Sequence, residues 1–195
     1  MQGLGQVNGA TANGPLLRFA GVALERGGRL LFDTLDFELA PGEGLHVAGP
    51  NGSGKSSLIR LTAGLLRASA GDIVRAPAGL ADDSLALDRE LPLGRALQFW
   101  GSPMEPAMDA LGISRLAHVP VRLLSSGQRK RATLARVAAS GAPLWLLDEP
   151  LNALDAEGAE RLARIIRAHR DAGGAVVAAS HQPLHGEWRI LELGR

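Results

Sequence analysis

The stretch Gly49-Pro50-Asn51-Gly52-Ser53-Gly54-Lys55-Ser56 decides the fold of this chain. It fits the phosphate-loop pattern, in which a glycine and four further residues precede Gly-Lys-Ser/Thr. Residues 45–48, Leu-His-Val-Ala, predict a short buried strand before the loop, and residues 57–66 carry apolar side chains at helical spacing after it. The flanking strand and helix disfavour the alternative of a simple glycine-rich turn. The pattern therefore predicts a nucleotide-binding α/β fold.

The residue types of this loop suit the binding of phosphate. Its glycines allow positive φ and a close approach of the main chain to an oxygen atom. Backbone N–H groups at the start of a helix attract anions, and we expect Lys55 to bridge the β- and γ-phosphates and the Ser56 hydroxyl to hold Mg²⁺. The predicted nucleotide-binding residues here are Gly49, Pro50, Asn51, Gly52, Ser53, Gly54, Lys55, Ser56 and Ser57.

Composition limits the classes of protein to which the chain could belong. Its 195 residues are 46% apolar and 21% charged, which suits one ordinary globular domain. The formal net charge of +1 argues against a nucleic-acid partner. The lack of cysteine excludes disulfides and thiolate metal sites. No apolar run is long enough to span a membrane, and residues 1–14 lack the features of a secretory signal, so we expect a flexible tail and a cytoplasmic location.

Periodicity and turn residues predict the order of the elements. Residues 15–39 read as two strands of an antiparallel hairpin, because apolar and charged residues alternate near its end. A helical insert at about 82–140 should contain three helices, and the chain from 15 to 195 should form one domain. The remaining expected strands cover 71–74, 79–81, 143–148, 175–180 and 188–193, the three helices of the insert cover 93–100, 105–111 and 128–140, and one further helix covers 155–171.

Two carboxylates follow the apolar strand predicted at 143–148. Asp148 and Glu149 come directly after Leu146-Leu147, at a strand end, where α/β folds place their ligands. A buried carboxylate without a partner is costly, so this pair needs a function. We expect Asp148 to hold Mg²⁺ through water and Glu149 to polarise the water that attacks the γ-phosphate.

A series of five motifs resembles that of ATP-binding-cassette ATPases. The motifs are the phosphate loop, Leu-Ser-Ser-Gly-Gln at 124–128, Leu-Leu-Asp-Glu-Pro at 146–150, Asn-Ala-Leu-Asp at 152–155 and Ser-His at 180–181. The resemblance implies a P-loop NTPase with a RecA-like parallel core, an antiparallel β-subdomain and a helical insert, using ATP and Mg²⁺.

The same resemblance assigns roles to the remaining motifs. It implies a head-to-tail homodimer, or a paired cassette, in which ATP on one phosphate loop is closed over by the partner subunit's signature residues. The signature residues of this chain are Ser125, Ser126, Gly127 and Gln128. The resemblance also places Asp155 in the loop that links the two sites, and it implies that His181 contacts the γ-phosphate and holds the attacking water.

Three departures from this family pattern affect the expected chemistry. The family's glutamine before the helical insert is absent, and the matching position lies near Asp82-Asp83-Ser84, best at Ser84. Arg26 stands about where an aromatic residue usually stacks on adenine, and a guanidinium can also stack on a base. Ser126 replaces the first glycine of the signature. Hydrolysis and its coupling to a membrane partner therefore stay open, and so does the contact to adenine.

Within this superfamily the sequence is most similar to the ATP-binding subunits of bacterial haem exporters for cytochrome c maturation. The phrases Ser-His-Gln-Pro-Leu at 180–184 and Pro-Leu-Trp-Leu-Leu-Asp-Glu-Pro at 143–150 carry this similarity. It implies integral membrane partner subunits and a peripheral position on the cytoplasmic face of the inner membrane. The alternatives are an ATPase subunit for another cargo, a regulatory subunit that hydrolyses ATP weakly, and a soluble cassette protein of translation or DNA repair.

A cluster of basic residues follows the signature. Arg129-Lys130-Arg131 and Arg136 could form a nucleic-acid patch, but a solvated helix face beside a phosphate site is the expected arrangement.

Overall fold

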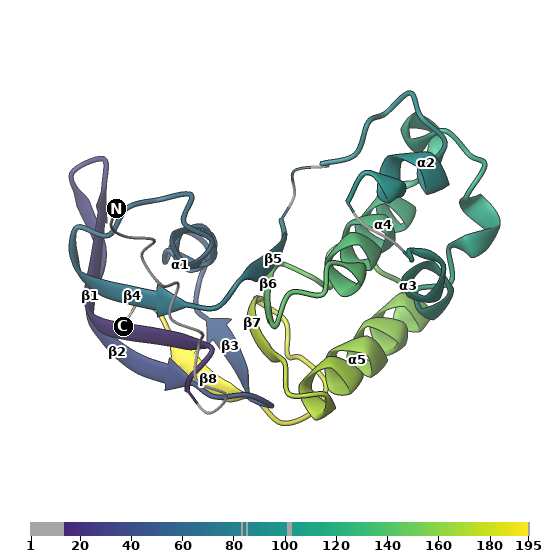
Figure 1. Cartoon of the computed structure of the whole chain (residues 1–195). Coiled ribbons are helices and arrows are strands. Elements are labelled where there is room, and N and C mark those ends of the chain that lie inside the picture. The colour runs from purple at the N-terminus through teal and green to yellow at the C-terminus, as the bar shows by residue number, and fades with distance from the viewer. Residues whose placement is uncertain (1–13, 83, 85, 101–102, 195) are drawn as a thin grey trace, which may run out of the picture.

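The computed structural model describes residues 14–82, 84, 86–100 and 103–194. Figure 1 shows an antiparallel sheet at one end, a parallel sheet in the middle and a group of helices at the other end. The tail predicted over residues 1–14 lies, apart from Gly14, outside the described residues. The phosphate loop lies between the antiparallel sheet and the parallel sheet, where β3 joins α1 (Figure 1).

The antiparallel sheet contains three strands in the order β2-β1-β4. β1 (Leu17–Arg26) and β2 (Arg29–Leu39) form the predicted hairpin, and Gly27 and Gly28 take positive φ at its turn. Phe19 and Phe37 stack across the two strands with ring centroids 4.6 Å apart. β4 (Ala70–Arg75) pairs with the other edge of β1. The prediction of an antiparallel hairpin before the phosphate loop is therefore confirmed.

The parallel sheet has the strand order β5-β6-β7-β3-β8. Its strands are β3 (Gly44–Ala48), β5 (Ala78–Ala81), β6 (Leu144–Asp148), β7 (Ala175–Ala179) and β8 (Arg189–Glu192). Every residue of β6 and β7 is buried, as expected for central strands covered on both faces. The carboxyl ends of β3, β6 and β7 meet at one edge, which positions the loops that follow them. This arrangement confirms the predicted α/β fold.

α1 and α5 are two of the helices that pack on the parallel sheet. α1 (Lys55–Thr62) was predicted to reach residue 66, and that prediction is wrong at its end. The helix stops because Gly64 takes φ +80° and leaves Leu65 62% exposed. α5 (Ala156–Asp171) begins after Asp155, whose side chain accepts a hydrogen bond from the Gly158 N–H at 2.8 Å.

The helical lobe shares one apolar core with β6, β7 and α5. It contains α2 (Leu93–Gln98), α3 (Glu105–Ala110) and α4 (Ser126–Ala139), so the three predicted helices are present, although α2 ends two positions early. Two short 3₁₀ turns, Ser114–Leu116 and Val121–Leu123, were not predicted. Within the described ranges, no helix is long and apolar enough to cross a membrane.

Candidate functional site

The phosphate loop is shaped by glycines at positions that no other residue would occupy easily. Gly49 takes φ +145°, and a Cβ there would lie 2.4 Å from the Leu193 carbonyl oxygen. Gly54, with φ +105°, is the N-cap of α1 and supplies no side chain to cap the helix. The N–H groups of the first helical turn are therefore left to an incoming anion.

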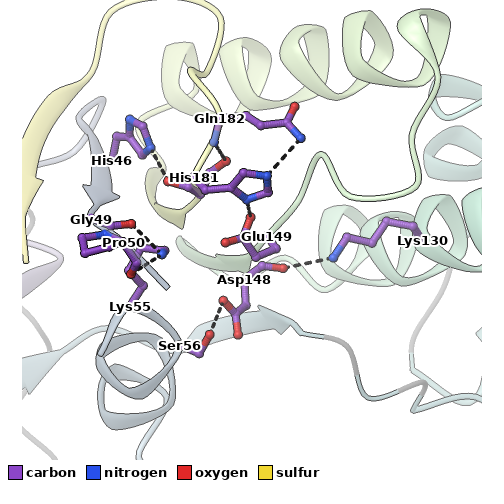
Figure 2. A network of polar contacts seen from close by, with 11 residues as sticks. His46, Gly49, Pro50, Lys55, Ser56, Lys130, Asp148, Glu149, His181 and Gln182 are labelled. Atoms are coloured by element: carbon purple, nitrogen blue, oxygen red, sulfur yellow. Dashed lines mark hydrogen bonds and ion pairs between the residues drawn. The ribbon is translucent and has the colours of Figure 1, made fainter. Parts of the chain in front are cut away.

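Lys55 lies buried beneath this loop and is held by it. Its ammonium group donates hydrogen bonds to the carbonyl oxygens of Gly49 at 2.8 Å and Pro50 at 3.1 Å. Figure 2 shows the side chain curling back toward the loop from the start of α1. A buried ammonium next to a set of N–H groups gives the loop a local positive charge, which favours phosphate.

Ser56 connects the phosphate loop to the end of β6. Its hydroxyl donates a hydrogen bond to Asp148 Oδ1 at 2.9 Å, and Lys130 Nζ donates to the Asp148 backbone oxygen at 3.0 Å (Figure 2). Asp148 is only 4% exposed. A hydroxyl and a carboxylate are oxygen ligands of the kind that Mg²⁺ takes beside substrate phosphates, so the residues present fit this ion.

Glu149 and His181 face each other across the ends of two strands. His181 Nδ1 lies 2.8 Å from Glu149 Oε2, and the Glu149 N–H donates to the Ala179 carbonyl at 2.8 Å. Glu149 has φ +44°, an unusual conformation for a residue with a side chain. Strain of this kind at a strand end indicates that the position of the Glu149 carboxylate is set by the surrounding structure.

A cavity of about 800 Å³ opens over these groups. It brings together residues of the phosphate loop, Arg26 of the hairpin turn, Glu149 and His181. Gly49, Pro50, Ser53 and Asp148 are not among its lining residues, although Gly49, Pro50 and Asp148 are bonded to residues that are. The lining residues are Arg26, Gly27, Leu31, Asn51, Gly52, Gly54, Lys55, Ser56, Ser57, Glu149, Asn152 and His181.

The signature residues lie in a different place. Ser125 caps α4 in a reciprocal pair with Gln128, in which the Gln128 N–H donates to Ser125 Oγ at 3.2 Å and the Ser125 N–H donates to Gln128 Oε1 at 2.9 Å. Together with Ser126 and Gly127 they line a second cavity of about 350 Å³, which shares no lining residue with the first. Within one chain, the structure therefore does not bring the signature to the phosphate loop.

The signature helix contacts the loop that follows Glu149. A Cβ on Gly127 would lie 2.6 Å from the Ala153 carbonyl oxygen, so only glycine allows this approach. The Arg131 guanidinium donates to Asp155 Oδ1 in the same region. The Gly158 N–H and then the Arg131 guanidinium lower the pKa of Asp155 below its usual value. The ionised Asp155 carboxylate therefore bonds to Arg131 and holds α4 against the start of α5.

The basic residues after the signature do not form a solvated face, so that expectation is wrong. Lys130 is buried and bonded to Asp148, and Arg131 is bonded to Asp155. The Arg136 guanidinium lies over the Trp100 ring at 4.6 Å and donates to the Leu80 carbonyl at 2.6 Å. Burial lowers the pKa of Arg136, and the charge of Asp82 partly opposes this effect. These side chains join the helical lobe to β5 and β6.

Two further residues complete the surroundings of the site. Ser84, the best match to the missing glutamine, has its N–H and hydroxyl bonded to Asp82 Oδ1 at 3.1 and 2.6 Å, while Asp83 lies outside the described residues.

His46 was not predicted to matter, yet its Nε2 lies 3.0 Å from the Ser180 carbonyl oxygen, next to His181. A histidine within an otherwise apolar strand before the phosphate loop was the available signal.

Comparison with known sequences shows close relatives. The model of the family described as "ABC transporter" matches residues 32–152. The chain is similar to the "Cytochrome c biogenesis ATP-binding export protein CcmA" of Sphingopyxis alaskensis, at 53% identity over 85% of this chain and 90% of the relative. The protein of the same description from Novosphingobium aromaticivorans is 57% identical over 84% of this chain and 87% of the relative.

Comparison with solved structures supports the fold. A structure described as the ATP-binding subunit of an ABC transporter has a TM-score of 0.78 at 19% identity, over 85% of this chain and 79% of that one. A putative ABC transporter ATP-binding protein from Pyrococcus furiosus has a TM-score of 0.80 at 18% identity, over 91% and 96% of the two chains.

Proposed function

The chain belongs to the ABC transporter family, and from this premise we propose that it binds and hydrolyses ATP to drive haem export for cytochrome c biogenesis. The observation that carries the ATPase part is the cavity that gathers Lys55, Ser56, Glu149 and His181. The printed function of the relatives at 53% and 57% identity supports the cytochrome c part.

ATP binding follows from the charges and N–H groups of the phosphate loop. Lys55 would transfer its hydrogen bonds from the Gly49 and Pro50 carbonyls to the β- and γ-phosphates, while the first-turn N–H groups of α1 bind the remaining oxygens. Arg26 lines the same cavity, where its guanidinium can stack on the adenine ring. Arg26 and the residues of the phosphate loop that line this cavity would together bind the nucleotide.

Ser56 and Asp148 are the residues that would hold Mg²⁺. Their side-chain oxygens already lie within 2.9 Å of each other, at the edge of the phosphate loop. When bound, the ion supplies positive charge to the β- and γ-phosphate oxygens and thereby favours departure of the leaving ADP.

Hydrolysis uses the pair formed by Glu149 and His181. The Glu149 carboxylate would accept a proton as the water oxygen bonds to the γ-phosphorus and the bond to the β–γ bridging oxygen breaks. His181 bonds to Glu149 at 2.8 Å, and its exposed ring would orient both the carboxylate and the γ-phosphate. The products are ADP and inorganic phosphate.

A second copy of the chain would complete the site. The signature at Ser125–Gln128 lines its own cavity at the N-terminus of α4, away from the phosphate loop of the same chain. In a head-to-tail homodimer this cavity would cover the ATP held by the partner, and its N–H groups would contact the γ-phosphate. We further propose that the dimer binds integral membrane subunits on the cytoplasmic face of the inner membrane.

Two measurements test the two parts of this proposal. The purified chain should release phosphate from MgATP, and Lys55→Ala should weaken ATP binding by at least about a hundredfold because the loop loses its buried charge. In Novosphingobium aromaticivorans lacking its own relative, the chain should restore haem attachment to c-type cytochromes, and Lys55→Ala should not. Phosphate release without restoration by a well-expressed chain would refute haem export and leave the ATPase, and no phosphate release would refute the ATPase.

A second candidate function is a regulatory subunit that binds ATP and hydrolyses it weakly. The observation in its favour is that Ser84 stands near the position of the family's glutamine, with its polar groups bonded to Asp82. Steady-state phosphate release in the presence of the membrane subunits would distinguish the two. A rate that does not rise above that of the Glu149→Gln variant would favour the regulatory subunit.

A further inference from the structure

The ladder between β3 and β7 ends where both strands enter the site. His46 pairs with Ala178 and Val47 with Ala179, and the Ser180 N–H then reaches the Val47 carbonyl at a longer 3.3 Å. Beyond this point β3 turns away at Gly49 into the phosphate loop. The Ser180 carbonyl therefore lies where the backbone of β3 no longer runs alongside it.

The side chain of His46 supplies a donor at this point. His46 Nε2 lies 3.0 Å from the Ser180 carbonyl oxygen, and the two residues are 9% and 1% exposed. Because a carbonyl oxygen only accepts, His46 must carry its proton on Nε2. Leaving a carbonyl buried to this degree without a hydrogen bond would destabilise the folded protein, so the contact with His46 is strongly favoured.

The Ser180 carbonyl belongs to the peptide that leads into His181. A peptide unit is planar, so a fixed carbonyl also fixes the N–H of His181 and the direction in which the chain continues. After His181, the Gln182 N–H donates to Ser180 Oγ at 3.0 Å and holds the following turn. Figure 2 shows His46 on one side of this segment and Glu149 on the other, with His181 between them.

We propose that His46 is a positioning residue for hydrolysis, which acts by holding the peptide before His181 so that the ring meets Glu149. The inference rests on the proposed ATPase function and adds a residue to its machinery. His46 does not line the 800 Å³ cavity, whereas His181 and Glu149 do. Loss of the His46 donor should therefore lower kcat and leave the affinity for ATP unchanged.

Three variants separate the hydrogen bond from the packing. His46→Leu fills the space without a donor, and His46→Asn carries a donor on a shorter side chain. His46→Gln places an amide N–H at about the reach of Nε2. We expect kcat to fall by about tenfold to a hundredfold in His46→Leu and His46→Asn, because a displaced catalytic group lowers the rate by this order. His46→Gln should recover most of the rate, and the dissociation constant for ATP should stay within about twofold in all three.

A double-mutant cycle tests whether His46 acts through His181. In a His181→Ala background, His46→Leu should cause no further loss of kcat, because the group that it positions is gone. Independent losses that multiply would overturn the proposal, as would wild-type kcat in His46→Leu or an equal loss in His46→Gln and His46→Leu. A wild-type chain that releases no phosphate would instead refute the proposed function itself.

Thermal unfolding and ATP binding are measured for each variant, so that a loss of kcat is not confused with misfolding or with loss of ATP binding. If His46→Leu does not fold, the comparison of His46→Asn with His46→Gln replaces it. A difference in kcat between these two polar side chains supports the hydrogen bond, and equal values refute it.

Discussion

The Ser56 hydroxyl donates a hydrogen bond to Asp148 Oδ1 over 2.9 Å, although the two residues are 92 positions apart in the chain. The contact joins the first turn of α1 to the end of β6. The Ser56 hydroxyl, and Asp148 through water, would hold Mg²⁺, which would supply positive charge beside the phosphates.

Ser56→Ala should weaken binding of MgATP by roughly tenfold while changing binding of ATP in EDTA by less than about twofold, because only the ion loses a ligand. Ser56→Thr keeps the hydroxyl and serves as the matched control, with near wild-type affinity in both conditions. Fluorescent-nucleotide titration with and without Mg²⁺ measures the difference. An equal loss in the two conditions would contradict the assignment of Ser56 to the ion.

Glu149→Gln should leave ATP binding intact and lower phosphate release by at least about a hundredfold, because the amide cannot accept the proton of the attacking water. The trapped ATP should also stabilise the dimer, which size-exclusion chromatography with MgATP detects. Glu38→Gln, at an exposed residue of β2 bonded to Arg18, is a control with unchanged turnover. Unchanged turnover in Glu149→Gln would remove Glu149 from the role of base.

Gly127→Ala should impair turnover without impairing ATP binding by the monomer. The added Cβ would lie 2.6 Å from the Ala153 carbonyl oxygen, so α4 or the loop after Glu149 must move. We expect a loss of phosphate release of about tenfold or more, as for other displaced catalytic groups. The control is Gly94→Ala in α2, where a Cβ would lie 3.3 Å from the Ala117 carbonyl oxygen. Equal effects of the two substitutions on turnover would argue against a special role for the approach at Gly127.

His169 should make the stability of the fold depend on pH. Its ring stacks on Trp145 with centroids 3.9 Å apart, and burial lowers the pKa of His169. The unfolded chain, with a histidine pKa of about 6.5, then binds protons more readily than the folded chain. Stability is full above that pH and falls as the pH drops toward the folded-state pKa.

Urea unfolding at pH 7.5 and 5.5 measures this loss of stability, and His169→Phe, which keeps a ring on Trp145, serves as the control. The decrease between the two pH values should be smaller in the variant. An equal decrease in both proteins would assign the effect to other groups.

Much of the fold could be predicted because its signals are local. The phosphate loop, the apolar run of β6 and the alternation in β2 each identify an element without reference to the rest of the chain. Which sheet a short strand joins is a different question. Residues 71–74 and 79–81 both read as brief strands, yet β4 joins the antiparallel sheet and β5 joins the parallel one. Partner choice depends on tertiary packing, which the local pattern does not contain.

The burial of the basic residues after the signature differs from what their charge led us to expect. Lys130 precedes Thr133, Leu134 and Val137 by three, four and seven positions, and all three are buried in α4. That spacing places Lys130 on the inner face of the helix. Helical periodicity therefore indicates that Lys130 is buried, whereas its charge alone suggests that it is exposed. The contact between His46 and Ser180 joins residues 134 positions apart. The histidine in an apolar strand indicates a buried polar side chain, but the local sequence does not indicate its partner.

Gly49 lies against the Leu193 carbonyl, and the Leu193 N–H donates to the Ala48 carbonyl at 2.9 Å. The phosphate loop therefore contacts backbone that lies about 144 positions later in the chain. Translation of that length takes roughly seven to thirty seconds at ordinary rates. A nascent chain would expose the phosphate-loop sequence well before the loop could take its final shape. Newly made subunits should therefore begin to bind ATP only after β8 has left the ribosome and paired with β3.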